Sequence, residues 1–577
     1  MHTSRAGDWP AYGRDGTRNA AAAETLAVPL AQAWVFAAPH PPRPAWPSTA
    51  RQDIWHELTD LPHVVAYDRV FHAIAAGDRV YFGSSADDKV YALDAGTGEV
   101  RWTFFTEGPV RLAPAYAQGR LYVGSDDGCV YCVDAATGAL VWTHRAAVSA
   151  RRIPGNGRLV SDMPVRAGVL VDGDTVYACA GLFPPKAALA CALDARTGAP
   201  RWSRLLESVS PQGYLSASPA RLFVPTGRTS PAVLDRAAGE YLGAFEGDGG
   251  TEIVFHAGIL FHGPGRHTGE KLAAGDPATL ARGGELPGVR AVFAGEIAYL
   301  QSKRELSALR YEPYLVLSRR AAQLRGEREK AVEAFKREPE GDRKRAAAAR
   351  AGELAARIAE AVQAMQQCVV WTHTTACTTA LLLAGDTLIA GGDGAVVALA
   401  AADGRVLWTA EVQGCAYGLA AARGRLFAST DKGVIHCFAP AAQAGADVRA
   451  PAPASGEAPA PRDVETARRI LATSGVTKGW CLVLGSGEGR LVRALAAASD
   501  LAIVGLERDP GKVARSRAAL DAAGLYGPRA AILMWEGDRI PCTDYIADLV
   551  VADAIRSDGT PPAELHEILR VTRPAGG

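Results

Sequence analysis

The chain of 577 residues lacks several features that would assign it to a particular class of protein. No apolar run approaches the ~20 residues of a membrane-spanning helix, so no span is expected. The ten cysteines are too few for a disulfide scaffold, and no pair of C-x-x-C motifs indicates a structural zinc site. Lys and Arg together number 62, as do Asp and Glu, and this zero net charge does not favour a nucleic-acid-binding protein.

The beginning of the sequence has no apolar segment of the kind found in a secretory signal peptide. The expected location is therefore cytoplasmic, or exported if the N-terminus is incomplete. Apolar residues make up 48% of the chain and charged residues 21%, which is typical of folded globular domains. The 61 glycines indicate many tight turns.

Four stretches of the sequence align as one repeated pattern. Each contains a strand, a turn with Gly and Asp, an alternating strand, a D-x-x-T-G or D-G turn, and a strand that carries Trp. Trp102 and Trp142 are 40 residues apart, and Trp371 and Trp408 are 37 apart. Such spacing with hairpin turns predicts a β-propeller. The four stretches are residues 79–104, 120–144, 175–203 and 387–410.

Counting these periods predicts an all-β propeller of eight blades over residues 1–440. The eighth blade, at residues 424–440, lacks its last strand. Residues 31–37 contain the unpartnered Trp34 and are expected to supply that strand, which would close the ring and remove its exposed edges. The other blades are expected to end near Trp102, Trp142, Trp202, Phe245, Gly284, Trp371 and Trp408.

Three aspartates recur at the start of the D-x-x-T-G turns and could be read as catalytic groups. A structural role is favoured, because a turn Asp can accept backbone hydrogen bonds through its side chain. The recurring Trp is similarly expected to pack between neighbouring blades. The aspartates are Asp94, Asp134 and Asp194.

The repeat A-L-D-x-x-T-G-x-x-x-W resembles the pyrroloquinoline-quinone-type propeller repeat, and the opening residues 8–12, DWPAY, resemble the start of such domains. The resemblance covers residues 8–440 and is weak over 239–310. The family includes quinone-dependent dehydrogenases and non-enzymatic scaffolds such as the outer-membrane assembly lipoprotein. The dehydrogenases typically carry an adjacent Cys-Cys pair, and none occurs here. Pyrroloquinoline quinone is therefore not expected as a cofactor. A protein partner is expected to bind the propeller face.

Residues 312–367 differ from the repeats and are rich in Ala, Glu, Lys and Arg. They predict a helical hairpin inserted into the propeller, broken at residues 339–342. Its basic residues could meet an acidic protein partner, although interleaved acidic residues favour a solvated surface. Residues 441–462 are rich in Ala and Pro and predict a semi-stiff linker. One helical face is expected to contain Leu354, Ile358, Val362 and Met365.

Residues 463–577 alternate predicted helices and strands, which indicates a partial α/β, Rossmann-like domain. The first strand is followed by a glycine-rich turn, residues 485–489, that would let the backbone approach a ligand. The second strand ends at Glu507, 22 residues past Gly485, where an acid can bind ribose hydroxyls. The third strand is expected to end at Asp538, and the sheet order to be 3-2-1-4.

These features resemble class I S-adenosylmethionine-dependent methyltransferases over residues 467–577. The resemblance implies that the glycine-rich turn contacts the methionine end of the cofactor, Glu507 its ribose and Asp538 its adenine. No metal site and no catalytic residue is implied, because residues 553–556 do not form a recognised catalytic tetrad. The candidate cofactor-binding residues are Gly485, Ser486, Gly487, Glu488, Gly489, Glu507 and Asp538.

Two alternatives stay open, and one further prediction concerns the end of the domain. A nicotinamide-binding Rossmann domain is the structural rival, although the Gly-Asp pair after the third strand and the P-x-G-G end favour a methyltransferase. Val483 departs from the methyltransferase pattern, because many members have Asp at that position. The C-terminal domain could also be a vestigial, nucleotide-binding-like module on a non-enzymatic propeller scaffold. The family's later strands are absent, so the domain is expected to be truncated at Gly577, with its fourth strand left as an edge.

Overall fold

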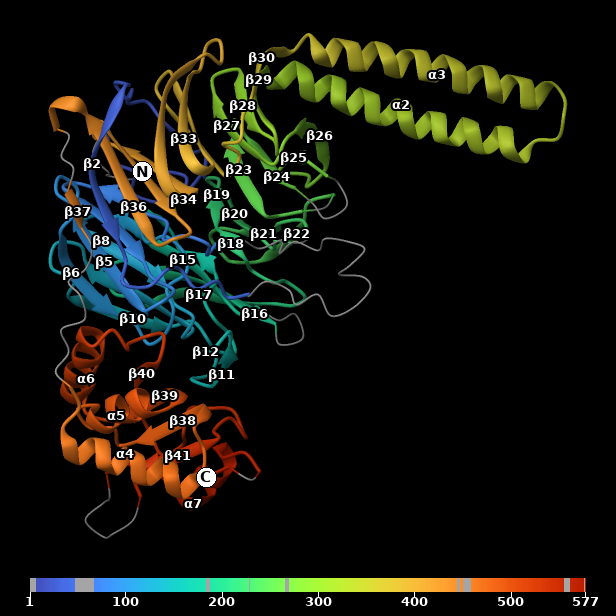
Figure 1. Ribbon diagram of the computed structural model, residues 1–577. Coiled ribbons are helices and arrows are strands. Elements are labelled where there is room, and N and C mark those ends of the chain that lie inside the picture. Colours follow the sequence, from blue (N-terminus) through green and yellow to red (C-terminus); the bar gives the residue numbers. More distant parts are fainter. Residues whose placement is uncertain are drawn as a thin grey trace.

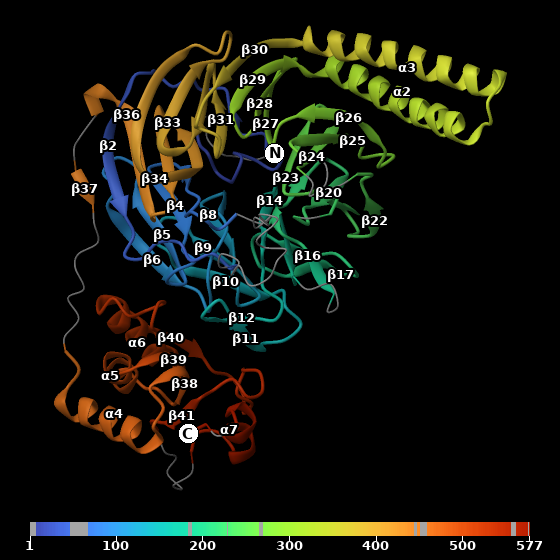
Figure 2. The ribbon, with the colours of Figure 1, turned by 45° about the vertical axis from the view of Figure 1, so that its right-hand side comes forward.

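The computed structural model describes residues 7–46, 67–182, 187–227, 229–247, 249–264, 269–443, 447–449, 458–554, 561–574, 576 and 577. The chain forms a large β-rich region, residues 7–449, and a smaller C-terminal region, residues 458–577 (Figure 1). Two long helices project from the β-rich region on the side away from the C-terminal region (Figures 1 and 2). None of the described helices is both long and apolar enough to cross a membrane.

The β-rich region is built from small antiparallel sheets that pack face to face. On strand β4 (Arg79–Gly83), Val80 and Phe82 belong to one apolar cluster and Tyr81 to the next, as a side-chain period of two requires. Cys129 and Cys132 likewise belong to different clusters, so they face opposite sides of their strand. Each sheet therefore shares its apolar faces with two neighbours.

Within the described residues of the β-rich region, six sheets have four strands each, in chain order. They are β3–β6 (Ile74–Ala76, Arg79–Gly83, Lys89–Asp94, Val100–Phe105), β7–β10 (Ala115–Ala117, Arg120–Gly124, Cys129–Asp134, Leu140–Arg145), β14–β17 (Leu170–Asp172, Thr175–Ala180, Ala188–Asp194, Pro200–Leu206), β19–β22 (Ser216–Ala217, Arg221–Val224, Ala232–Asp235, Tyr241–Ala244), β23–β26 (Glu252–His256, Ile259–Gly263, Lys271–Gly275, Arg282–Pro287) and β27–β30 (Arg290–Ala294, Ile297–Gln301, Glu305–Arg310, Val369–Thr374).

A nine-stranded sheet follows, in which the long strand β34 (Val406–Ala422) is shared by two units. The last strand of the second unit is β2 (Leu30–Ala37), which pairs antiparallel with β36 (Val434–Pro440). The prediction that the Trp34 segment supplies the strand missing near Pro440 is confirmed by this pairing. The other members are β31–β33 (Ala380–Ala384, Thr387–Gly391, Asp393–Ala400), β35 (Arg425–Thr430), and the parallel outer strands β1 (Ala21–Ala22) and β37 (Asp447–Arg449).

Tryptophans of one sheet dock on the turn of the next sheet. Trp34 Nε1 donates to the carbonyl oxygen of Ala95 at 3.1 Å, and a Cβ added at Gly98 would lie 2.7 Å from the Trp34 ring. Because Trp34 belongs to the last unit and Gly98 to the sheet β3–β6, this contact joins the two ends of the series. Trp102, Trp142, Trp202 and Trp371 lie in the same way against Gly138, Gly198, Gly239 and Gly404.

The recurring aspartates have the structural role that the sequence predicts. Asp94 Oδ1 accepts hydrogen bonds from the backbone N–H groups of Gly96 and Thr97, at 2.9 and 3.0 Å. Asp134 and Asp194 make equivalent bonds in their own turns. Each Asp therefore fixes the turn on which a tryptophan of the preceding sheet docks.

The predicted helical hairpin is formed by α2 (Tyr311–Arg337) and α3 (Asp342–Gln366). It is inserted between β29 and β30, as the sequence predicts, and its break lies at residues 338–341, one residue earlier than the predicted 339–342. Leu324 of α2 and Leu354 of α3 are buried. Towards its tip the hairpin extends away from the sheets (Figure 1).

The C-terminal region has a four-stranded parallel sheet in the order β40-β39-β38-β41, which is the predicted order 3-2-1-4. Next to β41, the N–H of Gly577 donates to Asp548 O, and Gly577 O accepts from Val550 N, both at 2.9 Å. The elements are β38 (Lys478–Leu484), β39 (Asp500–Glu507), β40 (Ala530–Met534), β41 (Leu549–Ala552), α4 (Pro461–Ser474), α5 (Arg490–Ala498), α6 (Pro510–Ala522) and α7 (Leu565–Val571).

The structure differs from the sequence predictions in three places. Strand β40 ends at Met534 rather than Asp538, because the chain turns at Gly537, which has a φ of +77°. The predicted linker contains β37, which pairs with β2. An unpredicted hairpin, β11 (Arg152–Gly155) and β12 (Arg158–Ser161), and the short pair β13 (Ala167–Gly168) and β18 (Gly213–Tyr214) interrupt the repeats.

Candidate functional site

The glycine-rich loop connects the end of β38 to the start of α5. Its three glycines have φ values of +64°, +57° and +74° for Gly485, Gly487 and Gly489, a region that favours glycine. A Cβ at Gly485 would lie 2.8 Å from the Ala554 side chain, and one at Gly489 would lie 2.2 Å from Ser516 Oγ. A Cβ at Gly487 would meet no atom within 4 Å. Two glycines therefore serve internal packing, and Gly487 faces open space that a ligand could approach.

Glu507, at the end of β39, holds this loop. Its side chain is only 7% exposed. Oε2 accepts a hydrogen bond from the N–H of Gly487 at 2.7 Å, and Oε1 accepts from the N–H groups of Arg508 and Asp509, at 2.9 and 3.0 Å. The structure therefore brings two predicted site residues into direct contact at the carboxyl ends of adjacent strands.

Asp538 lies in the loop after β40 and is connected to this site through one arginine. Its side chain is 90% exposed, and Arg508 Nη2 lies 3.8 Å from its carboxylate. The Arg508 guanidinium lies 4.3 Å from the centre of the Trp535 ring. An exposed carboxylate beside a planar cation and an aromatic ring is free to accept a hydrogen bond from a ligand.

Ser486 and Glu488, the two other predicted residues of the loop, make contacts apart from the one between Gly487 and Glu507. The Ser486 side chain is 1% exposed, and its hydroxyl packs against the backbone of Gly505 under β39. The Glu488 carboxylate receives hydrogen bonds from Arg515 and Arg490, which lower its pKa. Glu488 faces a hollow of about 200 Å³ between α5 and α6, which neither Glu507 nor Asp538 lines.

Asp553 is a carboxylate near the loop that the sequence did not indicate as a site residue. It follows β41, and its N–H donates to Leu484 O at 3.0 Å. Partial desolvation and the negative charges of Asp463 and Glu507 raise the pKa of Asp553. Its position after the carboxyl end of a parallel strand is the signal that could have identified it.

Metal ligation has no support in the described part of the chain, where no group of three or more His, Cys, Asp or Glu side chains is placed to hold an ion. The ten cysteines are buried as free thiols. Burial raises the pKa of Cys481 on β38 to about 12, so this thiol stays protonated near neutral pH.

Comparison with known protein families gives a match to a described family. The sequence profile described as outer membrane protein assembly factor BamB matches residues 49–207, 86–250 and 347–498, which together make up more than half of the chain. The chain belongs to this BamB family. The last matched segment runs from α3 across the linker and into α5. Membership agrees with the repeat of strands, turns and tryptophans in the β-rich region.

Solved structures resemble the chain at low identity. BamB from Moraxella catarrhalis is 15% identical, with a TM-score of 0.42, over 65% of this chain and 97% of that chain. Quinohemoprotein alcohol dehydrogenase from Comamonas testosteroni is 14% identical, with a TM-score of 0.49, over 81% and 85%. A candidate S-adenosyl-L-methionine-dependent methyltransferase from Methanococcus maripaludis is 30% identical, with a TM-score of 0.18, over 20% and 53%. No curated protein matches the chain.

Proposed function

We propose that the β-rich region is an eight-bladed propeller that acts as a protein-binding scaffold, and that the C-terminal region binds S-adenosylmethionine as a class I methyltransferase-like domain. The domain limits proposed are residues 1–440, a linker at 441–462, and residues 463–577. The proposal includes no pyrroloquinoline quinone, because the sequence has no adjacent cysteine pair.

The observation that carries the cofactor proposal is the contact between the glycine-rich loop and Glu507. In a parallel sheet, ligands bind outside the carboxyl ends of the strands, beside the first loop. Gly487 and Glu507 meet there, 2.7 Å apart between N–H nitrogen and carboxylate. The first turn of α5 has no side-chain cap, so its N–H groups are available to a carboxylate such as that of a methionine moiety.

The ribose contact is limited by the bonds that Glu507 already makes. A carboxylate offers about four acceptor positions, and backbone N–H groups occupy three of them. One ribose hydroxyl can bind without other change, whereas a second requires the Gly487 N–H to give up its bond. We therefore expect the loop to shift at Gly487 when the cofactor binds.

When bound, S-adenosylmethionine supplies an activated methyl group. The residues of this chain would orient the cofactor: Gly487 by close backbone approach, Glu507 through the ribose and Asp538 through the adenine. Methyl transfer from a sulfonium needs no proton transfer by these groups. No methyl acceptor or catalytic base is assigned.

The test is calorimetric titration of the full chain with S-adenosylmethionine. One binding event is expected for the unmodified protein, and the Glu507→Gln variant should bind more weakly by about 1–3 kcal/mol, the scale of a hydrogen bond to a charged group. Glu465→Gln, an exposed carboxylate on α4, is the matched control and should leave binding unchanged. Binding of NADH instead of S-adenosylmethionine would support the nicotinamide alternative and refute the proposal.

A second function, a non-enzymatic scaffold with a vestigial nucleotide-binding-like domain, is favoured by one observation. Three backbone N–H groups hold the Glu507 carboxylate, which is what a purely structural carboxylate would show. Absence of binding for both cofactors, in a folded chain, is the result this alternative predicts.

A further inference from the structure

The sheet of the C-terminal region has two apolar faces that are covered by different parts of the chain. Cys481, Val483 and Ile503 share a cluster with residues of α4, α5 and α6. Leu482, Leu484, Val504, Leu506 and Leu533 lie in a second cluster, formed with α7 and the loop after β40. This second cluster also contains Leu159, which comes from β12 in the β-rich region.

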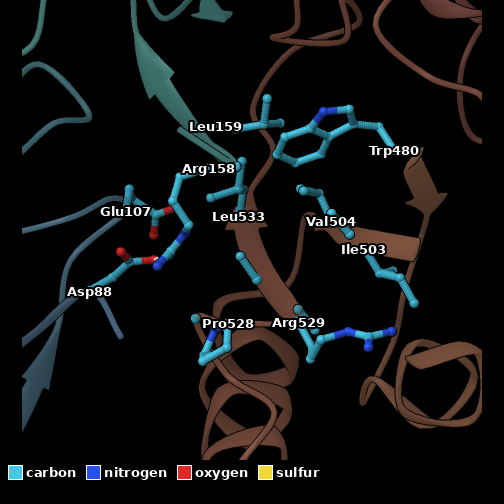
Figure 3. Close-up of a pocket in the computed structure, with 15 residues that line it drawn as sticks. Asp88, Glu107, Arg158, Leu159, Trp480, Ile503, Val504, Pro528, Arg529 and Leu533 are labelled. Atoms are coloured by element: carbon cyan, nitrogen blue, oxygen red, sulfur yellow. Dashed lines mark hydrogen bonds and ion pairs between the residues drawn. The ribbon is translucent and has the colours of Figure 1, made fainter. Parts of the chain in front are cut away.

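Leu159 lies in the core of the C-terminal region although it is more than 300 residues away in the sequence. Its side chain is 6% exposed. In Figure 3 it lies next to the Trp480 ring and near Leu533 of β40, beside a cavity of only about 20 Å³. Such a volume has room for about one water molecule, so the contact is closely packed. Both views place the β11–β12 hairpin against this sheet (Figures 1 and 2).

The hairpin also pairs with the C-terminal region through its backbone. The N–H of Arg152 donates to Pro541 O, and Arg152 O accepts from the N–H of Thr543, both at 2.8 Å. These residues form a parallel bridge between Arg152 and Cys542. Residues 541–543 belong to the segment that leads from Asp538 back to β41, so the hairpin holds the chain next to a candidate cofactor residue.

The hairpin itself is anchored to the sheet β3–β6. Arg158 Nη1 donates to Ala86 O at 2.7 Å, and Arg158 forms an ion pair with Asp88, both side chains being buried. Nearby, Gly527 approaches the backbone so closely that an added Cβ would lie 2.1 Å from Ala86 O. Figure 3 shows the Arg158 guanidinium at Asp88, with Glu107 beside the Arg158 side chain.

Glu107, which follows β6, closes the free edge of β40. Its Oε2 accepts a hydrogen bond from the N–H of Met534 at 3.0 Å, and Oε1 forms an ion pair with Arg517 of α6. Arg517 Nε in turn donates to Ile532 O at 3.0 Å. Edge strands carry unpaired N–H and C=O groups that need such partners. Burial would raise the pKa of Glu107, but Arg517 and the Met534 N–H outweigh it and keep this carboxylate ionised.

We propose that the β11–β12 hairpin and Glu107 complete the C-terminal fold, so that the β-rich region is the fixed partner of the cofactor-binding sheet. Leu159 covers its second apolar face, Arg152 holds the segment after Asp538, and Glu107 is a positioning residue for the end of β40. The part concerning the cofactor rests on the proposed function. The part concerning the sheet does not.

The experiment compares amide hydrogen exchange and S-adenosylmethionine binding in variants of the full chain. Glu107→Ala should speed exchange at Met534 about 10-fold or more, because it removes both the acceptor and the ion pair. Glu107→Gln keeps an acceptor oxygen, so it should affect Met534 less while still weakening the contact with Arg517. Leu159→Ser should speed exchange across residues 541–543. The control is Glu99→Ala, because Glu99 carries an exposed carboxylate next to β6. It should change exchange neither at Met534 nor at residues 541–543.

The two proposals fail separately. If amide exchange at Met534 and at residues 541–543 is the same in all variants, the structural inference is overturned, whatever the cofactor result. Equal cofactor affinity in the unmodified chain and in Glu107→Ala, with faster exchange at Met534, overturns the positioning role. If the unmodified chain binds no S-adenosylmethionine, the proposed function fails, and the exchange results still decide whether the β-rich region supports the sheet.

Discussion

Replacement of Trp34 by Ala tests whether the series of sheets is closed into a ring. The Trp34 side chain is 1% exposed, donates to Ala95 O at 3.1 Å and packs on Gly98 of the first sheet. Truncation of a buried Trp to Ala costs about 3–5 kcal/mol, because apolar burial is lost and a cavity is left. The Ala95 carbonyl also loses its partner, worth about 1 kcal/mol. We therefore expect Trp34→Ala to lower the free energy of unfolding by about 4–6 kcal/mol.

Urea unfolding followed by circular dichroism measures this change. The control is Trp46→Ala, because Trp46 is 41% exposed and the Arg166 guanidinium lies 5.9 Å from the centre of its ring as a cation–π partner. Its loss should cost about 1 kcal/mol or less. A Trp34→Ala variant as stable as this control would show that the strand around Trp34 does not close the β-rich region.

Three further predictions concern the loop, acid stability and the hairpin. Gly489→Ala should destabilise the chain by about 1–3 kcal/mol in urea, because its Cβ would lie 2.2 Å from Ser516 Oγ at positive φ, whereas Gly487→Ala should cost less. Burial lowers the pKa of His72 to about 4, whereas an unfolded His titrates near 6.5, so the unfolded state binds more protons as the pH falls below 6.5. The free energy of unfolding should therefore fall by about 3 kcal/mol between pH 7 and pH 4, measured by urea unfolding at each pH. The His72→Gln variant should lose less stability over the same range. Deletion of residues 326–352 with a short turn in their place should leave the melting temperature unchanged, because this outer part of the hairpin lies away from the sheets; a drop of several degrees would contradict that placement.

The sequence predicts the sheets of the β-rich region best where a Trp meets a turn Gly. Trp102 and Gly138 form such a pair, and the period of 40 residues follows from it. The repeat is hard to recognise near Phe245, which stands in place of Trp, and in the next turn, where Leu280 adopts a φ of +62° that Gly adopts elsewhere. Packing maintains the fold there although the local pattern has changed.

In the C-terminal region the order of elements and the contact between Gly487 and Glu507 follow from local patterns. The apolar residues before Asp538 predict a strand that ends there, but the chain turns at Gly537 and the strand ends at Met534. The roles of Leu159 and Glu107 could not be predicted. They depend on contacts between residues hundreds of positions apart, and periodicity within a segment carries no information about these.

The structure of the full chain with S-adenosylhomocysteine tests the central claim most directly, since this compound retains the adenosyl group without the methyl. We expect its ribose on Glu507, its adenine beside Asp538 and Arg508, and the Gly487 N–H moved away from the Glu507 carboxylate. A ligand bound elsewhere, or a site at Glu507 that stays closed by the Gly487 N–H at saturating ligand, would contradict it.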